Sequence, residues 1–212
     1  QAGEDGVLAV VTKSGVRLPA DLVVLGLGVR PDIGIAKAIG LEIGERGGLR
    51  VDGHMRTSDP DIYAVGDAVE VTDRVLGGRA VIPLAGPANR QGRIAADNIF
   101  GIPSTYKGTL GTAVLRLFGL TAACTGANEK GLRREGRVFE VINLHPGSHA
   151  GYFPGAHPIA LKLIFEAASG RVLGAQAVGR DGIDKRIDVI ATAIMGGMTV
   201  DDLAELELCY AP

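Results

Sequence analysis

The chain has 212 residues, enough for one large domain or two small ones, and 46% of them are hydrophobic and 22% charged, as in ordinary globular proteins. Its net charge of −2 gives no reason to expect nucleic acid or an anionic membrane as a partner, and no apolar run reaches the length of a membrane span. Gln1 begins polar, turn-like sequence, so no signal peptide is expected. Two cysteines without a Cys-x-x-Cys motif argue against a disulfide framework or a structural zinc site and fit a reducing cytoplasm.

The first forty residues predict a β-hairpin, a strand and a short helix. Residues 7–18 place two β-prone runs around a Lys-Ser-Gly turn, as in a hairpin, and residues 21–27 (DLVVLGL) form an apolar run typical of a buried strand. The run leads to Gly28 and Pro31, where a dinucleotide-binding loop would need a third glycine and the start of a helix. Gly28 is therefore read locally as a turn glycine, and residues 33–39 as a short helix.

Residues 57–68 (TSDPDIYAVGDA) are the most informative stretch of the chain. Ser-Asp-Pro-Asp favours a turn, and Ile62–Val65 is a short apolar run suited to a buried parallel strand. Gly66 has no Cβ, so a ligand can approach the backbone closely. Asp67 would then lie at the carboxyl end of a strand, where ligands bind in open α/β sheets, and can accept hydrogen bonds from polyol hydroxyls. The alternative is that Asp67 only caps the next turn.

The following segment predicts a β excursion over residues 69–82 and then a helix over residues 87–99. Pro87 suits the first turn of this helix, and Gly101 follows its end. The free N–H groups and the positive dipole end of such a helix start stabilise negative charge. The alternative is a helix that packs on a sheet without any ligand.

The pattern changes after a linker at residues 103–110, and strands and helices follow that suggest an α+β unit of about a hundred residues. The predicted strands cover residues 111–118, 120–125, 138–143, 159–166 and 172–178, and the predicted helices cover residues 128–134, 184–195 and 201–208. Thr199 is a candidate cap for the last helix. The three histidines of the 145–157 loop are too irregularly spaced to predict a metal site.

The 57–68 stretch resembles the second flavin-binding motif of the pyridine nucleotide–disulfide oxidoreductases. The resemblance implies α/β portions of the NAD(P)H- and FAD-binding domains over residues 1–102 and an α+β dimerisation domain over residues 103–212. It implies that Asp67 and Gly66 lie at the ribityl chain of FAD and that Gly28 approaches the nicotinamide. The Pro-Leu-Ala-Gly segment implies backbone contacts from Leu84 and Ala85 to the flavin.

Two later segments resemble the coenzyme A-disulfide reductase branch of that family: HAGYFPGA at residues 149–156 and ELCYAP at residues 207–212. The resemblance implies that Tyr152 and Tyr210 approach the partner subunit's active site, where a phenol can hydrogen-bond a thiolate or donate its proton. The alternatives are a loop tyrosine packed on proline for Tyr152 and an interface aromatic for Tyr210. The His-Pro-x-x-x-Glu acid/base motif of classical members is missing.

The resemblance implies the carboxyl-terminal half of a homodimeric enzyme that passes electrons from NAD(P)H through FAD to a small-molecule disulfide or persulfide such as coenzyme A disulfide. The family's phosphate-binding glycine loops and redox cysteine have no counterpart here, and Cys124 and Cys209 are interpreted as small buried hydrophobes rather than nucleophiles. Two alternatives stay open, an NADH oxidase or peroxidase of the same family and an inactive dimerisation module.

Overall fold

The structure is a computed structural model that describes residues 8–210 and divides the chain into two compact units, residues 1–30 and 31–212. In the first unit, β1 (Leu8–Val11) and β2 (Arg17–Ala20) form an antiparallel hairpin that turns through Thr12 and Gly15. The predicted hairpin is confirmed, except that Val7 lies outside the described residues.

The strand predicted over residues 21–27 is wrong. These residues contain neither helix nor strand, and their side chains are exposed, Leu27 by 87%. A strand needs a hydrogen-bonding neighbour, and within residues 8–30 β1 and β2 pair only with each other. An apolar run therefore does not form a strand when no such neighbour is available.

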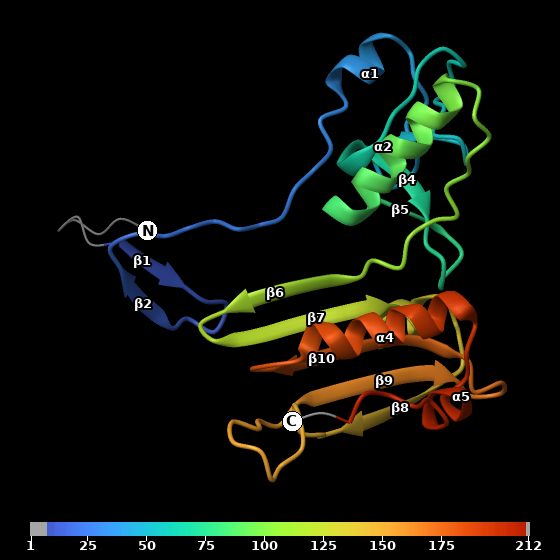
Figure 1. Cartoon of the computed structure of the whole chain (residues 1–212). Helices are drawn as coiled ribbons and strands as arrows, with labels where there is room; N and C mark the ends of the chain where they lie inside the picture. The colour runs from blue at the N-terminus through green and yellow to red at the C-terminus, as the bar shows by residue number, and fades with distance from the viewer. Residues whose placement is uncertain (1–7, 211–212) are drawn as a thin grey trace. The chain divides into compact units, whose positions relative to one another are not determined.

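The second unit begins with a region of short elements around one apolar core. It contains α1 (Gly34–Ala38), a small sheet and the long helix α2 (Ala85–Ile99) (Figure 1). In the small sheet, β3 (Leu49–Arg50) runs parallel to β4 (Val69–Thr72), which pairs antiparallel with β5 (Arg79–Ala80). These elements confirm the predicted short helix, the β excursion and the helix ending before Gly101.

Five antiparallel strands then form one sheet in the order β6-β7-β10-β9-β8. Their bounds are Ala113–Leu117, Leu120–Gly126, Val172–Gly179, Ala160–Glu166 and Phe139–Leu144 in that order. Each predicted strand of this region is confirmed, and each pairs with its neighbours in a defined register.

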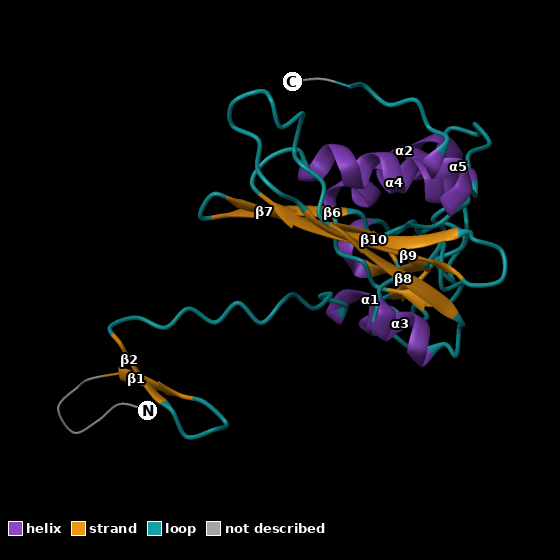
Figure 2. Cartoon of the chain, turned by 90° about the horizontal axis from the view of Figure 1, so that it is seen from below, coloured by secondary structure: helices purple, strands orange, loops and turns teal. Residues whose placement is uncertain are grey.

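Helices cover both faces of this sheet (Figure 2). On β9, Leu163 packs into the core under α4 (Ile183–Gly196), whereas the next residue, Ile164, packs into the core under α3 (Glu129–Arg134). Successive strand residues point to opposite faces, so one strand serves both cores.

The last helix, α5 (Val200–Ala204), is shorter than the predicted 201–208. Thr199 caps it as expected: its hydroxyl accepts the N–H of Asp202, whose side chain accepts the Thr199 N–H in return, forming a capping box. Residues 206–210 continue without helix. The helix ends because the polar, leucine-containing segment that follows packs no further apolar face, and most of the stability of a helix in a protein comes from such packing.

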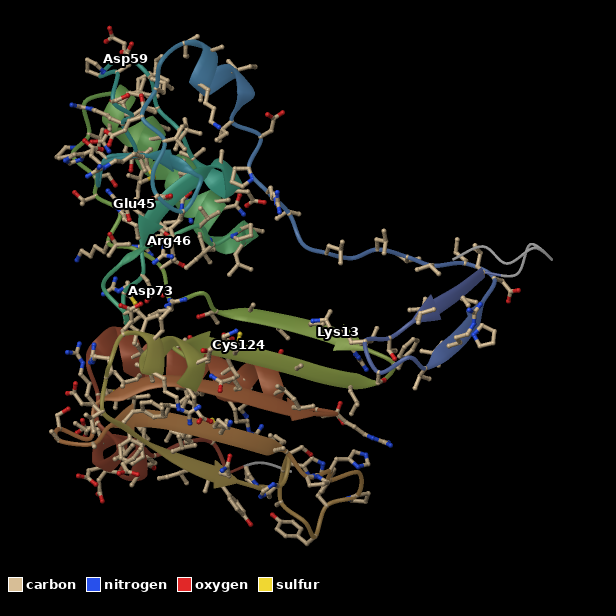
Figure 3. The ribbon with its side chains drawn as sticks, turned by 180° about the vertical axis from the view of Figure 1, so that it is seen from behind. Lys13, Glu45, Arg46, Asp59, Asp73 and Cys124 are labelled. Carbon is tan, nitrogen blue, oxygen red and sulfur yellow. The ribbon has the colours of Figure 1, made fainter. Side chains whose placement is uncertain are left out.

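The turn between β4 and β5, which contains Asp73, contacts the region of the large sheet (Figure 3). Asp73 Oδ1 accepts the N–H groups of Val75 and Leu76 at 2.9 Å each, and Arg74 N–H donates to Thr109 O at 3.0 Å. Val75 packs against both cores of the large sheet and Leu76 against one of them. Among residues 8–210, no helix has the length and hydropathy needed to cross a membrane.

Candidate functional site

The glycine-aspartate turn lies against α2. Gly66–Ala68 form a single 3-10 turn, η1, in which Gly66 has a φ of +77°, a region that favours glycine. The Gly66 N–H donates to Oε1 of Gln91, in the second turn of α2, at 2.7 Å. Gln91 is only 2% exposed, so this hydrogen bond is shielded from water and fixes the turn on the helix.

Asp67 is exposed at the start of η1, directly beyond this fixed glycine. The strand predicted before it is wrong, because residues 62–65 contribute only one β-bridge, between Tyr63 and Arg56. The hydrogen bond from the Arg56 guanidinium to the Tyr63 hydroxyl (3.1 Å) also raises the pKa of Arg56. The site thus depends on a loop held by side chains instead of on a strand end.

The start of α2 has free backbone donors. Leu84 is extended and its side chain caps nothing, and the first hydrogen bond of the helix runs from Ala88 N–H to Leu84 O at 3.1 Å. Within residues 8–210, the N–H groups of Ala85 and Gly86 have no hydrogen-bond partner. Because the helix dipole adds positive potential there, this end of the 15-residue helix can bind a negatively charged group.

The structure therefore brings four of the predicted site residues into one neighbourhood, because η1 and α2 are in contact: Gly66, Asp67, Leu84 and Ala85. Gly28 belongs to the other unit, where its φ of +88° favours glycine and a Cβ would meet open space. Residues 22–33 contain no turn, so the turn expected at Gly28 is wrong, although its positive φ still favours glycine.

A second candidate area lies at the amino end of α4. A hollow of about 410 Å³ opens there, lined by loop residues 147–150, by Gly182 just before the helix, by Lys185 and Arg186 of the helix, and by Cys209 and Tyr210. Tyr210 thus lines the hollow, whereas Tyr152 is exposed further along the same loop. In that loop, the rings of His149 and Phe153 meet edge to face at 5.9 Å.

The two cysteines do not meet. Cys124 lies on β7 (Figure 3), half-buried, with Sγ 4.0 Å from Gly111 O. Cys209 is exposed and outside any helix, so the expectation of a buried residue at a helix end is wrong for it. No group of three metal-binding side chains occurs among residues 8–210.

Sequence reasoning missed two polar residues that organise these areas, Gln91 and Arg186. Gln91 is the one polar side chain of α2 that is fully buried, between the apolar Ala88 and Ile94 of the helix. Arg186 lies on the first turn of α4, and its guanidinium donates to backbone carbonyls of a loop almost forty residues earlier. A polar residue on an apolar helix face was the available signal for Gln91; for Arg186 the sequence contains none, since its partners are backbone atoms.

Comparisons with known proteins cover almost the whole chain. A family model described as pyridine nucleotide-disulphide oxidoreductase matches residues 1–92, and a model described as the dimerisation domain of the same family matches residues 113–212. A coenzyme A disulfide reductase of Staphylococcus haemolyticus is 34% identical over 204 residues, and an NAD(P)H coenzyme A polysulfide/persulfide reductase of Pyrococcus horikoshii is 37% identical over 210. These alignments take in 96% and 99% of the chain but 46% and 47% of the relatives.

Comparison with solved structures agrees with these sequence matches. The reduced CoADR-RHD of Bacillus anthracis superposes with a TM-score of 0.93 at 52% identity, over 100% of this chain and 38% of that one. An NAD-dependent persulfide reductase from A. fulgidus also superposes with a TM-score of 0.93, at 44% identity over 99% of this chain and 39% of that one. The chain therefore spans just under half the length of the curated relatives that it matches.

Proposed function

From the premise that the chain belongs to the pyridine nucleotide-disulphide oxidoreductases, we propose that it forms part of a flavoprotein that reduces coenzyme A disulfide or a related persulfide at the expense of NAD(P)H. In this proposal residues 1–102 belong to the cofactor-binding portions and residues 103–212 form the dimerisation domain. A cytoplasmic enzyme would fit, because two unpaired thiols suit a reducing compartment.

One observation supports the cofactor assignment above all: the Gly66–Gln91 hydrogen bond, which holds the Gly66–Asp67 turn on α2. The residues present fit FAD, since an exposed carboxylate can accept hydrogen bonds from a polyol and the free N–H groups of Ala85 and Gly86 can donate to an electron-rich ring edge. Bound FAD would supply the two-electron redox chemistry. Asp67 would orient the cofactor, and the start of α2 would stabilise negative charge beside it.

The tyrosines are proposed to act on the substrate. A phenol can donate a proton or a hydrogen bond to a thiolate that leaves a disulfide, and Tyr210 lines a hollow that also contains Lys185 and Arg186. Cationic side chains suit a thiol compound that carries negative groups. Tyr152 would supply a second phenol from its exposed position in the loop.

Pairing with a second copy is supported by apolar side chains that the sheet leaves exposed. Phe118, at the β6–β7 turn, is 98% exposed, and four further large apolar residues of these strands are exposed with it: Val114, Leu115, Leu117 and Leu120. Exposed apolar groups of this extent are typical of interaction surfaces.

The assignment of Asp67 is tested by the variant Asp67→Ala in the full-length enzyme. Losing a charge-assisted hydrogen bond costs about 1.5–3 kcal/mol, so FAD should bind roughly ten- to a hundredfold more weakly. Flavin absorbance per protein and FAD titration of the apoprotein measure this. Asp61→Ala, which removes an exposed carboxylate from the same segment, is the matched control, and Asp67→Asn isolates the charge. Undiminished flavin affinity in both Asp67 variants would overturn the assignment.

A further inference from the structure

The loop that carries Tyr152 is closed at its root. Gly147 and Pro158 form a β-bridge, and the Ser148 N–H donates to His157 O at 2.8 Å. The Ser148 hydroxyl in turn accepts the His157 N–H at 3.1 Å. Since these bonds join the two ends of the loop, the residues between them can move as one piece about the root.

Arg186 attaches this root to α4. Its Nη2 donates to Ser148 O at 2.7 Å and to Gly147 O at 3.3 Å, and its Nη1 donates to Gly182 O, just before the helix, at 3.2 Å. Gly182 has a φ of +70°, and a Cβ there would come within 2.5 Å of Arg186 Nη1. One planar guanidinium thus joins three carbonyls, a pattern that the single ammonium of lysine cannot reproduce.

The same guanidinium forms a wall of the hollow that Tyr210 lines. None of the described residues that line this hollow is acidic, and Lys185 adds a second cation beside Arg186. Arg186 therefore touches both parts of the proposed tyrosine site: the root of the Tyr152 loop through hydrogen bonds and the hollow at Tyr210 through its position.

We infer that Arg186 is a positioning residue for the proposed reaction: it holds the Tyr152 loop on α4, so that the loop and the Tyr210 hollow keep one geometry, and gives the hollow a positive charge that favours an anionic thiol substrate. The inference rests on the proposed function for its substrate. It does not require Arg186 to take part in any bond-breaking step, since three of its five N–H donors already bind backbone carbonyls.

The first test measures the loop itself, with Arg186→Met, Arg186→Lys and the control Lys185→Met in the full-length enzyme. Chymotrypsin cleaves after exposed tyrosine, so mass spectrometry can follow the new amino terminus at Phe153. We expect cleavage to accelerate about tenfold or more in Arg186→Met, because even one of the two lost charge-assisted hydrogen bonds to the loop root predicts that factor, and to stay unchanged in Lys185→Met. Arg186→Lys should fall between them. Equal cleavage of wild type and Arg186→Met, at unchanged melting temperature, would overturn the inference.

The second test measures the substrate. For Arg186→Met we expect the KM for coenzyme A disulfide to rise about tenfold, while the KM for NAD(P)H and the flavin content stay unchanged, and we expect Arg186→Lys to recover part of the loss. A uniform fall of all parameters would indicate a merely structural role and contradict the inference. If the wild-type enzyme does not turn over coenzyme A disulfide, the proposed function fails, and the cleavage experiment still decides whether Arg186 holds the loop.

Discussion

The two regions of the second unit are built by different means. In the region from β6 to α5, every strand pairs antiparallel with a neighbour from the same region, and helices on both faces bury side chains such as Ile164 and Ile187 almost completely. In the region from α1 to α2, the longest strand has four residues, and loop residues such as Met55 and Val51 supply much of the core.

The difference bears on the proposed cofactor site, which lies in the region of short elements, whereas the hollow at Tyr210 lies on loops beside the packed sheet. Strands and helices that complete one another within the chain form a rigid body, whereas Asp67 and the donors of Ala85 and Gly86 are presented by an exposed turn and a helix start. Binding groups are often held on loops that a rigid scaffold positions. Here the scaffold acts through particular contacts, namely the buried Gln91 and the anchored β4–β5 turn.

The largest expected effect tests the rigid region. Ile187→Ala removes a side chain that is 1% exposed at the α4–sheet contact, and the lost burial and the cavity left behind should lower the free energy of unfolding by about 2–5 kcal/mol. The matched control is Ile35→Ala on α1, where the side chain is 82% exposed. Urea unfolding measures both, and equal losses would remove the contrast between the regions.

Two glycine-to-alanine substitutions compare the stability of the two regions by adding a methyl group instead of removing side-chain atoms. A Cβ at Gly174 on β10 would collide with the backbone of Ala127, which cannot rotate away, so Gly174→Ala should destabilise by about 1–3 kcal/mol or more. Gly92 lies inside α2 with open space around its Cβ position, so Gly92→Ala should stabilise by about 0.5–1 kcal/mol through helix propensity. Thermal and urea unfolding check the two signs, and a shared sign would contradict the prediction.

The sequence predicted the strands of the large sheet correctly but not the strands expected at residues 21–27 and 62–65, and strand pairing explains both outcomes. Where strands pair within a few dozen residues, as in the 159–178 hairpin, local pattern suffices to place them. The runs at 21–27 and 62–65 are as apolar as those strands, but their pairing is not encoded nearby, and neither forms a strand. An apolar run alone therefore fixes neither burial, as residues 21–27 show, nor a strand, which needs a hydrogen-bonding partner.

The candidate site was predictable as far as its residues lie in continuous motifs. Gly66, Asp67, Leu84 and Ala85 were predicted in this way, and the structure shows that η1 and α2 are in contact. Gln91 and Arg186 were not found, because each acts on backbone groups that are distant in the sequence. Such partners become visible only once the fold brings them together.

The smallest expected effect concerns the cap of α5, at the edge of the rigid region. Hydrogen bonds from the N–H and the hydroxyl of Thr199 to Asp202 lower the pKa of that carboxyl below its usual value. Because the folded pKa lies below the unfolded one, the contribution to stability is complete above the unfolded pKa, about 3.9, and is lost as the pH falls through the folded pKa. Wild type should therefore be slightly more stable than Asp202→Asn at pH 7, and the two should converge in strong acid.

Urea unfolding at a series of pH values measures this difference, and Asp201→Asn, which leaves the capping box intact, is the control. The contribution should be small because the carboxylate is exposed and water screens it. A difference between wild type and Asp202→Asn that does not change with pH would mean that the cap acts through shape alone. Convergence in acid would show that even the last helix of the rigid region is held by a local contact that its own few residues encode, in contrast to the turn at Asp67, which depends on a glutamine from another element.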